Sequence, residues 1–398
     1  MADAAVVGRI LREYHLRGLD PEGIRRLGGS VRGTRISYQV SHGGPPLVIR
    51  AFRAEAPVPV QFSGSAAETM THWVTGRAGT LACLAETGYP APRPVPSRTG
   101  DLVGVAGPWL TWATSYAEGT ALAPSLEQLR LLGRALGTLH AAPVDITGLR
   151  QAPAPSSAGP PQARAASAPG ETGGPATPAT AGAGAGQAGA AAVPGLAAWH
   201  PAAAVAGTLR RLRAVAPMLP ADWRDMHAAF LATAEAVRQN APDLPEALVH
   251  GDAWPGNAVQ PRPGLPGSRQ AGGGQVMLLD WETAGLGLPV LDLGNCLAEC
   301  HLDSGLPPDR PEAWLVRPDA HRIAAVASGY REVRELTGAE RELLPEAVRF
   351  GAAFAGAIHC EAALTGGASG PSMDARLGRL RNRLEISAEV ARLALRHL

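Results

Sequence analysis

The sequence predicts an α+β fold with a small β-rich lobe followed by a larger, mainly helical lobe, on either side of a cleft. Short β-rich runs separated by glycine and proline turns occupy the first part of the chain. From Leu126 onward, apolar residues instead recur at the spacing of an α-helix. With 398 residues, the chain is long enough to bury a sizeable core. We expect the lobes to span residues 1–113 and 114–398.

The small lobe should contain short strands joined by tight turns. Residues 37–40 and 47–52 form two β-rich runs, and the segment His42–Pro46 between them consists of glycine and proline after one histidine. This composition predicts a β-hairpin. Residues 108–114 follow as the expected last strand of the lobe and the hinge to the larger lobe.

The larger lobe should be built from packed amphipathic helices. Leu129, Leu132, Leu136 and Leu139 form one apolar stripe at helical spacing. Comparable patterns predict helices around residues 199–213, 322–336, 344–364 and 377–395.

Two segments stand apart by composition. Residues 151–194 are almost entirely Ala, Pro, Gly, Ser, Thr and Gln, with Arg164 and Glu171 as their only charges. Such a stretch buries too little apolar surface to offset the entropy of ordering it, so we expect a disordered insert. Residues 261–275 are rich in proline and glycine, which predicts an exposed hairpin connection.

Charge and cysteine content narrow the class of protein. The formal net charge is +1 and 18% of the residues are charged, so no strong field favours nucleic acid or an acidic membrane. The four cysteines lack the spacing of a disulfide framework, and the N-terminal segment has no continuous apolar signal core. No long apolar run could span a bilayer. We expect a cytoplasmic protein without nucleic-acid or membrane partners.

The most informative motif is His250-Gly251-Asp252 after a short apolar strand, with Asn257 later in the same turn and Asp280 after a second apolar strand. These residue types suit phosphoryl transfer. A hydroxyl nucleophile must lose its proton beside the γ-phosphate, and Asp252 is the candidate carboxylate for this step. Mg²⁺ requires hard oxygen ligands, which Asn257 and Asp280 can supply. Kinases use the same residue order and the same spacing between the first two residues.

This motif is similar to that of the aminoglycoside phosphotransferase and choline kinase-like family. The resemblance extends over most of the chain, through Gly28-Gly29-Ser30, residues 80–94, Leu136–His140, Asp280-Trp281-Glu282, residues 289–293 and Tyr330-Arg331-Glu332. It implies a protein-kinase-like fold. It also implies Mg²⁺-dependent transfer of the γ-phosphate of ATP or GTP to a hydroxyl of a small metabolite or antibiotic.

The same resemblance implies a nucleotide site in the small lobe. Ser30 lies in a glycine turn like the family's phosphate-covering loop, and Arg50 stands where the family usually has a phosphate-binding lysine. Trp109 and Thr111 belong to the hinge, where backbone groups of residues 109–113 would bind the base. The chain contains no lysine, so all 36 basic residues are arginine. Arginine suits phosphate but is bulkier than lysine.

Two carboxylates of the family pattern are displaced in this chain. The position expected for the acidic partner of the phosphate-binding lysine is Arg77, and Glu68 lies upstream in a stretch that matches poorly. Where many relatives have Gly-Asp-Pro, residues 287–289 read Gly-Leu-Pro. We therefore take Asp292 as the structural carboxylate of this region.

Alternatives remain at this stage. The missing lysine favours a catalytically impaired nucleotide-binding regulator, whereas the intact set Asp252, Asn257 and Asp280 argues against one. A protein-modifying kinase would share the fold, but the chain has no clear activation segment. Cys296, Cys300 and His301, with His359 and Cys360 elsewhere, could suggest zinc, although cysteines four apart on an apolar helix are more often buried thiols.

The acceptor is not identified by the sequence. Glu299, Asp303, His359 and Glu361 lie where relatives gather substrate contacts, although exposed helix faces explain them equally well. An aminoglycoside would require a strongly acidic pocket, and the last third of the chain has only scattered acidic residues. A metabolic or biosynthetic kinase is therefore no less favoured than a resistance enzyme.

Overall fold

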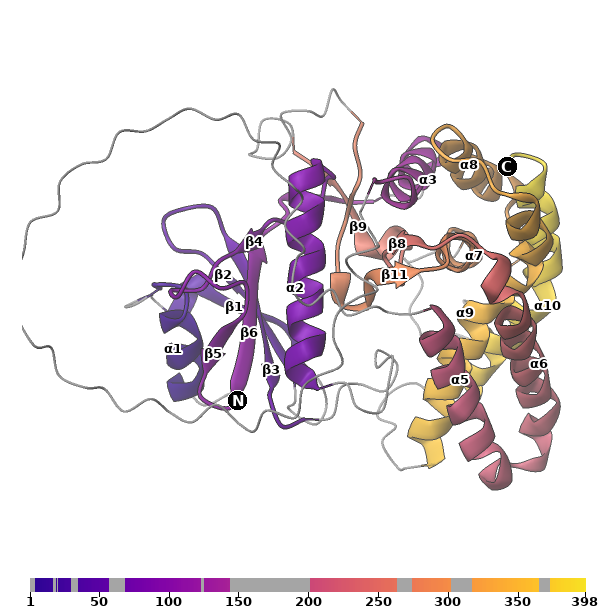
Figure 1. Cartoon of the computed structure of the whole chain (residues 1–398), viewed down its shortest axis with the longest axis horizontal. Helices are drawn as coiled ribbons and strands as arrows, with labels where there is room; N and C mark the ends of the chain where they lie inside the picture. The colour runs from indigo at the N-terminus through magenta and orange to yellow at the C-terminus, as the bar shows by residue number, and fades with distance from the viewer. Residues whose placement is uncertain are drawn as a thin grey trace, which may run out of the picture.

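In the computed structural model, an antiparallel sheet with a helix on each face forms the small lobe (Figure 1). The structure describes residues 4–16, 19, 21–29, 35–56, 69–122, 125–143, 201–262, 274–301, 317–364 and 373–398. In spatial order, the strands are β1 (Ile24–Gly29), β2 (Arg35–Val40), β3 (Leu47–Arg53), β6 (Trp109–Ser115) and β4 (Pro94–Val95), and β5 (Gly104–Ala106) also pairs with β6. The expected insert at 151–194 lies outside the described residues.

The predicted hairpin is confirmed as β2 and β3, in the middle of this sheet. The two strands pair antiparallel, with Ser37 opposite Arg50. Since side chains alternate along a strand, Arg50 and the buried Phe52 point to one face, and Ile49 points to the other.

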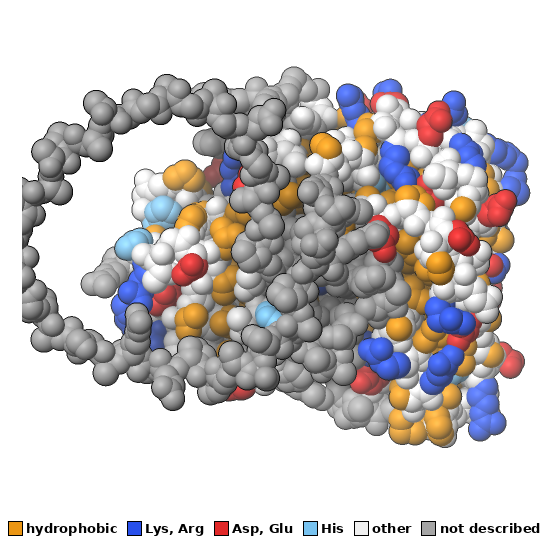
Figure 2. All heavy atoms as spheres, in the orientation of Figure 1, with side chains coloured by type: hydrophobic (Ala, Val, Ile, Leu, Met, Phe, Trp, Pro, Cys, Tyr) orange, Lys and Arg blue, Asp and Glu red, His pale blue; other side chains and the backbone are white. Residues whose placement is uncertain are grey.

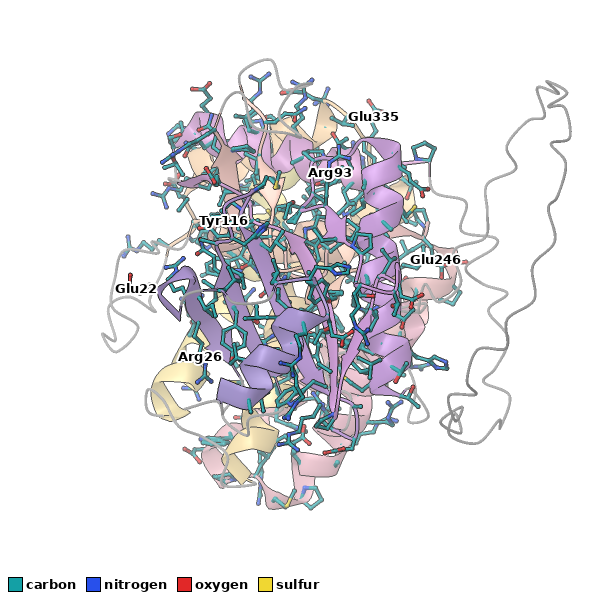
Figure 3. The ribbon with its side chains drawn as sticks, turned by 90° about the vertical axis from the view of Figure 1, so that its left-hand side faces the viewer. Glu22, Arg26, Arg93, Tyr116, Glu246 and Glu335 are labelled. Carbon is teal, nitrogen blue, oxygen red and sulfur yellow. The ribbon has the colours of Figure 1, made fainter. Side chains whose placement is uncertain are left out.

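A separate apolar cluster covers each face of the sheet. Helix α1 (Ala4–Arg12) and the following Tyr14 pack on the face of Ile49. Helix α2 (Met70–Thr87) packs on the face of Phe52, whose ring lies edge-on to Trp73 at 5.2 Å between centroids. Figure 3 views this lobe from outside, with α1 in front of the sheet and Tyr116, just after β6, labelled. Arg50 therefore faces α2.

The two lobes are joined by residues 116–118. Strand β6 continues to Ser115, which pairs with Leu47, so the small-lobe sheet extends beyond the boundary at residue 113 that we expected. Strand β7 (Gly119–Ala121) then pairs with β9 (Ala258–Pro261), which also pairs with β10 (Met277–Leu278). A further strand pair of the larger lobe is formed by β8 (Ala247–Val249) and β11 (Gly285–Gly287).

Helices form most of the larger lobe, as predicted. They are α3 (Leu126–His140), α5 (Pro201–Val215), α6 (Arg224–Asn240), α7 (Pro289–Glu299), α8 (Ala320–Arg331), α9 (Gly338–Leu364) and α10 (Met373–Leu395). Short 3₁₀ turns occupy Pro21–Gly23, Ala216–Met218, Ala221–Trp223, Ala241–Asp243, Pro255–Asn257 and Trp281–Thr283. The predicted stripe on α3, residues 129, 132, 136 and 139, is fully buried in the main core.

Helix α3 crosses α8 at unusually short range. A Cβ on Gly133 would overlap the backbone oxygen of Val326, and a Cβ on Gly329 would overlap that of Arg130. Glycine on both helices therefore permits this contact. The crossing brings the end of α3 close to Tyr330 on α8, a contact that supports the site described below.

Charges of both signs are mixed on the surface of the larger lobe. In Figure 2, arginine and acidic side chains alternate over its helices, in keeping with the net charge of +1. Within the described ranges, no helix combines the length and apolar character needed to cross a membrane.

Candidate active site

The predicted phosphoryl-transfer residues lie on two neighbouring loops. The Asp252 loop, residues 250–257, leads from β8 to β9, and the Asp280 turn, residues 279–284, leads from β10 to β11. Since β8 pairs with β11 and β9 pairs with β10, the ends of both loops are held together. Asp252 and Asp280 are consequently close enough for their charges to interact.

Asn257 is hydrogen-bonded directly to Asp252. Its Nδ2 atom donates to Oδ2 of Asp252 over 2.7 Å and to the backbone oxygen of Asp252 over 3.0 Å. The 3₁₀ turn Pro255–Asn257 returns the chain to Asp252, which explains the spacing of the two residues. Because the amide nitrogen faces Asp252, the amide oxygen is the atom of Asn257 that a cation could reach.

Asp252 has an unusual environment for a carboxylate. Desolvation raises its pKa to about 7, the charges of Asp280 and Glu299 act in the same direction, and the hydrogen bond from Asn257 opposes them. A carboxylate with a pKa near 7 accepts a proton from a hydroxyl more readily than an ordinary aspartate does.

Asp280 adopts a left-handed backbone conformation, with φ 61° and ψ 59°. Among the described residues other than glycine, only His15 also has a positive φ. This conformation costs about 1–2 kcal/mol for most residues, although aspartate tolerates it better than most. The Asp280 side chain is 48% exposed, so its carboxylate is open to a ligand.

Asp292, in the first turn of α7, holds the Asp252 loop through hydrogen bonds to its backbone. Its two carboxylate oxygens accept hydrogen bonds from the backbone N–H groups of His250, over 2.7 Å, and Gly251, over 3.1 Å. Burial alone would raise the pKa of Asp292, but hydrogen bonds from His140 and from the backbone of His250 lower it below its ordinary value. The predicted structural role of Asp292 is confirmed.

A buried chain of hydrogen bonds extends from Asp292 into the helical core. Nε2 of His140, at the end of α3, lies 3.2 Å from Asp292, and its Nδ1 lies 2.9 Å from the Tyr330 hydroxyl. Arg334 donates to the same hydroxyl over 2.9 Å. Tyr330 therefore donates to Nδ1, and the proton on Nε2 faces Asp292. Burial lowers the pKa of His140, which keeps this ring neutral.

His250 is structural, as expected. Its side chain is fully buried, its Nε2 lies 2.8 Å from the backbone oxygen of Leu279, and its Nδ1 accepts from the Asp252 N–H. The ring also contacts Trp281 edge-on. His250 thus ties the Asp252 loop to the Asp280 turn.

Arg50 meets this site from the small lobe. Its Nη2 atom lies 4.0 Å from Oδ1 of Asp280, and its Nε lies 3.4 Å from Oε1 of Glu282. Arg35 at the start of β2 forms a hydrogen-bonded ion pair with the other oxygen of Glu282. Burial and the neighbouring Asp280 raise the pKa of Glu282, and the two arginines oppose this.

The acidic partner of Arg50 is therefore Glu282, which our sequence reasoning missed. Arg77 occupies the buried position on α2, where it donates from Nε to the backbone oxygen of Glu282 over 3.0 Å. Glu68, the weaker sequence candidate, lies outside the described residues. The signal that could have found Glu282 is its place two residues after Asp280.

The side chains of Trp109 and Thr111, two of the other predicted nucleotide contacts, do not join this cluster. Trp109 and Thr111 point to the opposite face of the sheet from Arg50, where Thr111 accepts a hydrogen bond from Tyr14. The backbone of β6 pairs with β3 on one side and with β4 and β5 on the other, and base binding by residues 109–113 stays a prediction. Ser30 lies outside the described residues.

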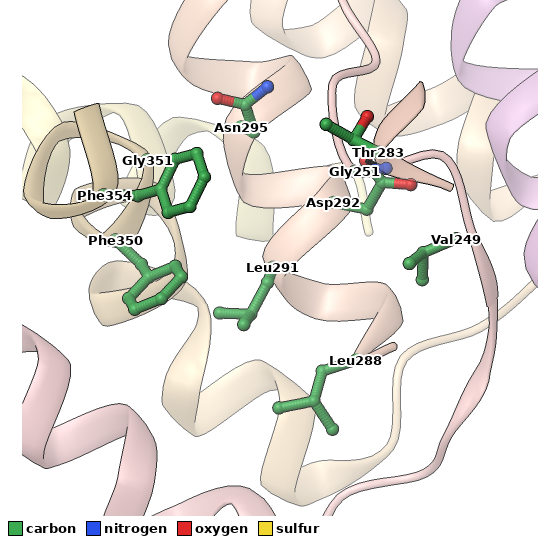
Figure 4. A pocket seen from close by; sticks show the side chains of 10 residues that line it. All are labelled: Val249, Gly251, Thr283, Leu288, Leu291, Asp292, Asn295, Phe350, Gly351 and Phe354. Atoms are coloured by element: carbon green, nitrogen blue, oxygen red, sulfur yellow. Dashed lines mark hydrogen bonds between the residues drawn. The ribbon is translucent and has the colours of Figure 1, made fainter. Parts of the chain in front are cut away.

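A small, mostly apolar pocket opens beside the Asp252 loop (Figure 4). Phe350 and Phe354 of α9 line one side, and Gly251 and Thr283 lie across from them, with Asn295 at one end. Its volume of about 40 Å³ could hold only a small group, so the pocket does not define an acceptor.

The acidic residues proposed as substrate contacts are paired with arginines where they are described. Glu299 binds Arg379 over 2.9 Å and Arg383 over 2.7 Å, and Glu361 binds Arg211 over 3.0 Å. Asp303 and the side chain of His359 lie outside the described part of the chain. Within that part, no three His, Cys, Asp or Glu side chains form a metal-binding group, and burial raises the pKa of the Cys296 thiol.

Sequence comparison identifies the family. Residues 38–336 of the 398 match the model of the family described as the phosphotransferase enzyme family, APH. The chain belongs to this phosphotransferase enzyme family. The resemblance on which the sequence prediction rested is thereby confirmed. A comparison with curated protein sequences gives no significant match.

Solved kinases share the fold of this phosphotransferase. Amicoumacin kinase hAmiN, in complex with AMP-PNP, Ca²⁺ and Ami, superimposes with a TM-score of 0.61 at 15% identity, over 98% of this chain and 94% of that chain. A microcompartment-associated aminopropanol kinase gives 0.54 at 16% identity, over 99% and 97% of the two chains. Choline kinase LicA from Streptococcus pneumoniae gives 0.52 at 11%, over 94% and 95%. The predicted protein-kinase-like fold is confirmed.

Proposed function

We propose that this phosphotransferase transfers the γ-phosphate of ATP or GTP to a hydroxyl of a small molecule, with Mg²⁺ as cofactor. The observation that carries the proposal is the hydrogen-bonded pair of Asp252 and Asn257 beside Asp280, with Arg50 approaching from the other lobe. This arrangement offers a base, two oxygen ligands and a phosphate-binding cation in one place.

Asp252 is the proposed catalytic base. The hydrogen bond from Asn257 occupies Oδ2, which leaves Oδ1 to orient the acceptor hydroxyl and take its proton. The raised pKa of Asp252, about 7, supports this role because a general base is most effective when its pKa lies near the working pH.

The oxygen donors of the site fit Mg²⁺. The carboxylate of Asp280 is half-exposed, and the amide oxygen of Asn257 faces away from Asp252. Two protein oxygens are a usual number for Mg²⁺, which keeps water and phosphate in its remaining positions. When bound, the ion would supply positive charge opposite the phosphates. Arg50 would add a second positive charge from β3.

A small-molecule acceptor is supported by the solved relatives, whose names include amicoumacin, aminopropanol and choline kinases. We do not favour a polycationic acceptor, because Glu299 and Glu361 already bind arginines of this chain. The class of acceptor is left to experiment.

A catalytically impaired nucleotide-binding regulator is the second candidate function. It is favoured by the absence of lysine and by the binding of Arg50 to Glu282 in the large lobe instead of to a carboxylate on α2. Such a protein would bind nucleotide with Mg²⁺ without transferring phosphate.

The test is phosphate transfer from radiolabelled ATP and GTP into a panel of aminoglycosides, choline, ethanolamine, amino acids and sugars. We expect Asp252→Asn to lower transfer by about 10²- to 10⁴-fold while nucleotide still binds. Asp243→Asn, at an exposed carboxylate in the turn before β8, is the matched control and should leave transfer unchanged. Nucleotide binding without transfer to any acceptor would support the regulator, and equal transfer by both variants would exclude Asp252 as the base.

A further inference from the structure

Helix α2 offers no carboxylate to the cation of β3. The one acidic residue of this fully described helix is Glu86, which is exposed close to its C-terminal end. The position that faces the site is Arg77, buried to 1% exposure and stacked at 5.6 Å from the Trp73 ring. A second cation in this position cannot pair with Arg50, so a partner must come from another element.

Glu282 of the large lobe is this partner. Its side chain is 5% exposed, and each of its two oxygens contacts a different arginine of the β2–β3 hairpin, Arg35 and Arg50. In the hairpin register, Arg35 lies opposite Phe52 and Ser37 lies opposite Arg50, so the two arginines are diagonal neighbours on one face. Both therefore converge on one carboxylate.

The backbone of Glu282 is fixed as well. Arg77 donates to its carbonyl oxygen, and α2 packs against the 3₁₀ turn Trp281–Thr283 that contains it. The same turn begins at Asp280, the proposed metal ligand. One short turn thus places a carboxylate for the metal and, two residues later, a carboxylate for the phosphate-binding arginines.

We propose that Glu282 is the positioning partner of Arg50 and also of Arg35, and that these two arginines together bind the phosphates of the nucleotide. This inference rests on the proposed kinase function. Arg35 is accessible for this role because 37% of its side chain is exposed, against 16% for Arg50. Two planar guanidinium groups supply the bidentate donors that phosphate oxygens accept.

The first experiment measures binding of Mg²⁺·AMP-PNP by calorimetry, with a double-mutant cycle. Arg35→Gln should weaken binding by about tenfold in the native background, the effect of losing one charge-assisted contact. In a Glu282→Gln background, the same substitution should weaken binding by less than about threefold, because Arg35 is no longer held in place.

The second experiment measures steady-state kinetics. Glu282→Gln should lower kcat by at least about tenfold with a smaller change in the KM for nucleotide, because misplaced phosphates affect the transition state most. Glu282→Asp should restore part of kcat. Glu55→Gln is the matched control, since Glu55 forms an exposed ion pair with Arg53 at the end of the same hairpin.

Each outcome separates this inference from the proposed function. If the native protein binds no Mg²⁺·nucleotide, the proposed function fails. If it binds and transfers phosphate, but Arg35→Gln has no effect or an equal effect in both backgrounds, the role of Glu282 and Arg35 is overturned. If Glu282→Gln does not fold, nucleotide binding by Arg35→Gln alone tests the inference. This variant should fold because the Arg35 side chain lies partly in solvent.

Discussion

At the scale of single residues, the site depends on two backbone positions in the left-handed region. Gly251 has φ 79°, and Asp280 has φ 61°. Gly251 also approaches the Asp280 turn closely, because a Cβ there would lie 2.7 Å from the backbone oxygen of Thr283. Any other side chain would push the two loops apart. Glycine at 251 is therefore required by contact as well as by conformation.

This requirement gives a prediction for Gly251→Ala. It should reduce the free energy of unfolding by more than the roughly 1–2 kcal/mol that a left-handed alanine costs, because the contact with Thr283 is added. Gly100→Ala is the matched control, since Gly100 has φ 86° and no atom within 4 Å of the added Cβ. Urea unfolding checks both variants. Equal losses of the free energy of unfolding in the two variants would show that the contact with Thr283 does not contribute.

At the scale of elements, three helices hold the Asp252 loop through one buried chain of hydrogen bonds. His140 ends α3, Tyr330 lies on α8, and Asp292 lies in the first turn of α7. Asp292 completes the chain by accepting from two N–H groups of the loop. The close crossing of α3 and α8 makes this chain possible, so helix packing sets the position of the Asp252 loop.

Removing the Tyr330 hydroxyl should destabilise this arrangement. Tyr330→Phe leaves Nδ1 of His140 buried without its donor, which should cost about 1–3 kcal/mol of the free energy of unfolding. Tyr38→Phe is a matched control, because the buried hydroxyl of Tyr38 has no hydrogen-bond partner among the described residues. Urea unfolding of both variants checks the prediction, which a similar loss in Tyr38→Phe would contradict.

The buried histidines of these elements predict how stability depends on pH. Burial lowers the pKa of His140, and it lowers the pKa of His301, just after α7, to about 4 from an ordinary value of 6.5. Below pH 6.5 these two histidines therefore bind more protons in the unfolded chain than in the folded chain. Their contribution to the free energy of unfolding should be fully present above pH 6.5 and should be lost as the pH decreases towards 4. The raised pKa values of Asp252 and Glu282 act in the opposite direction over this range.

Urea unfolding at pH 7.5 and pH 5 measures this effect. His301→Gln should remove the contribution of His301, so that acidification from pH 7.5 to 5 costs the variant less stability than the native chain, by up to about 1.4 kcal/mol for each pH unit below 6.5. His72→Gln, at an exposed position of α2, should keep the native difference. A native-sized pH difference in His301→Gln would rule out His301 as a contributor.

At the scale of the whole molecule, the proposed site is shared between the lobes. The small lobe contributes Arg35 and Arg50, and the large lobe contributes Asp252, Asp280 and Glu282. Residues 116–118 connect the lobes along the chain, and the pairing of β7 with β9 fixes the end of this connection to the large lobe. A ligand that contacts both lobes should therefore stabilise the folded chain as a unit.

This arrangement predicts metal-dependent stabilisation by nucleotide. At a nucleotide concentration of about 100 Kd, Mg²⁺·ATP should add about 2.7 kcal/mol to the free energy of unfolding, seen as a rise in Tm. EDTA should abolish most of this rise, and so should Asp280→Asn, because both remove the metal from the site. An unchanged rise in EDTA would show that nucleotide binds without metal.

The amino-acid sequence by itself determined the family, the β2–β3 hairpin, the helical character of the larger lobe, and the candidate set Asp252, Asn257 and Asp280. These follow from local signals: short β-rich runs and turns, the helical stripe on α3, and the fixed spacing within one loop. The structure places Asn257 in hydrogen-bond contact with Asp252, as a spacing of one tight turn allows.

Only the tertiary structure decided which residue partners Arg50 and which side chains lie on the same face of the small-lobe sheet as Arg50. Glu282 is far from Arg50 in the chain, and the side chains of Trp109 and Thr111 lie on the opposite face of the sheet from Arg50. Neither fact follows from spacing in the sequence. The physical reason is that strand register and helix packing assign each side chain to a face. Both assignments depend on contacts between residues far apart in the chain, and a local sequence pattern carries no information about such contacts.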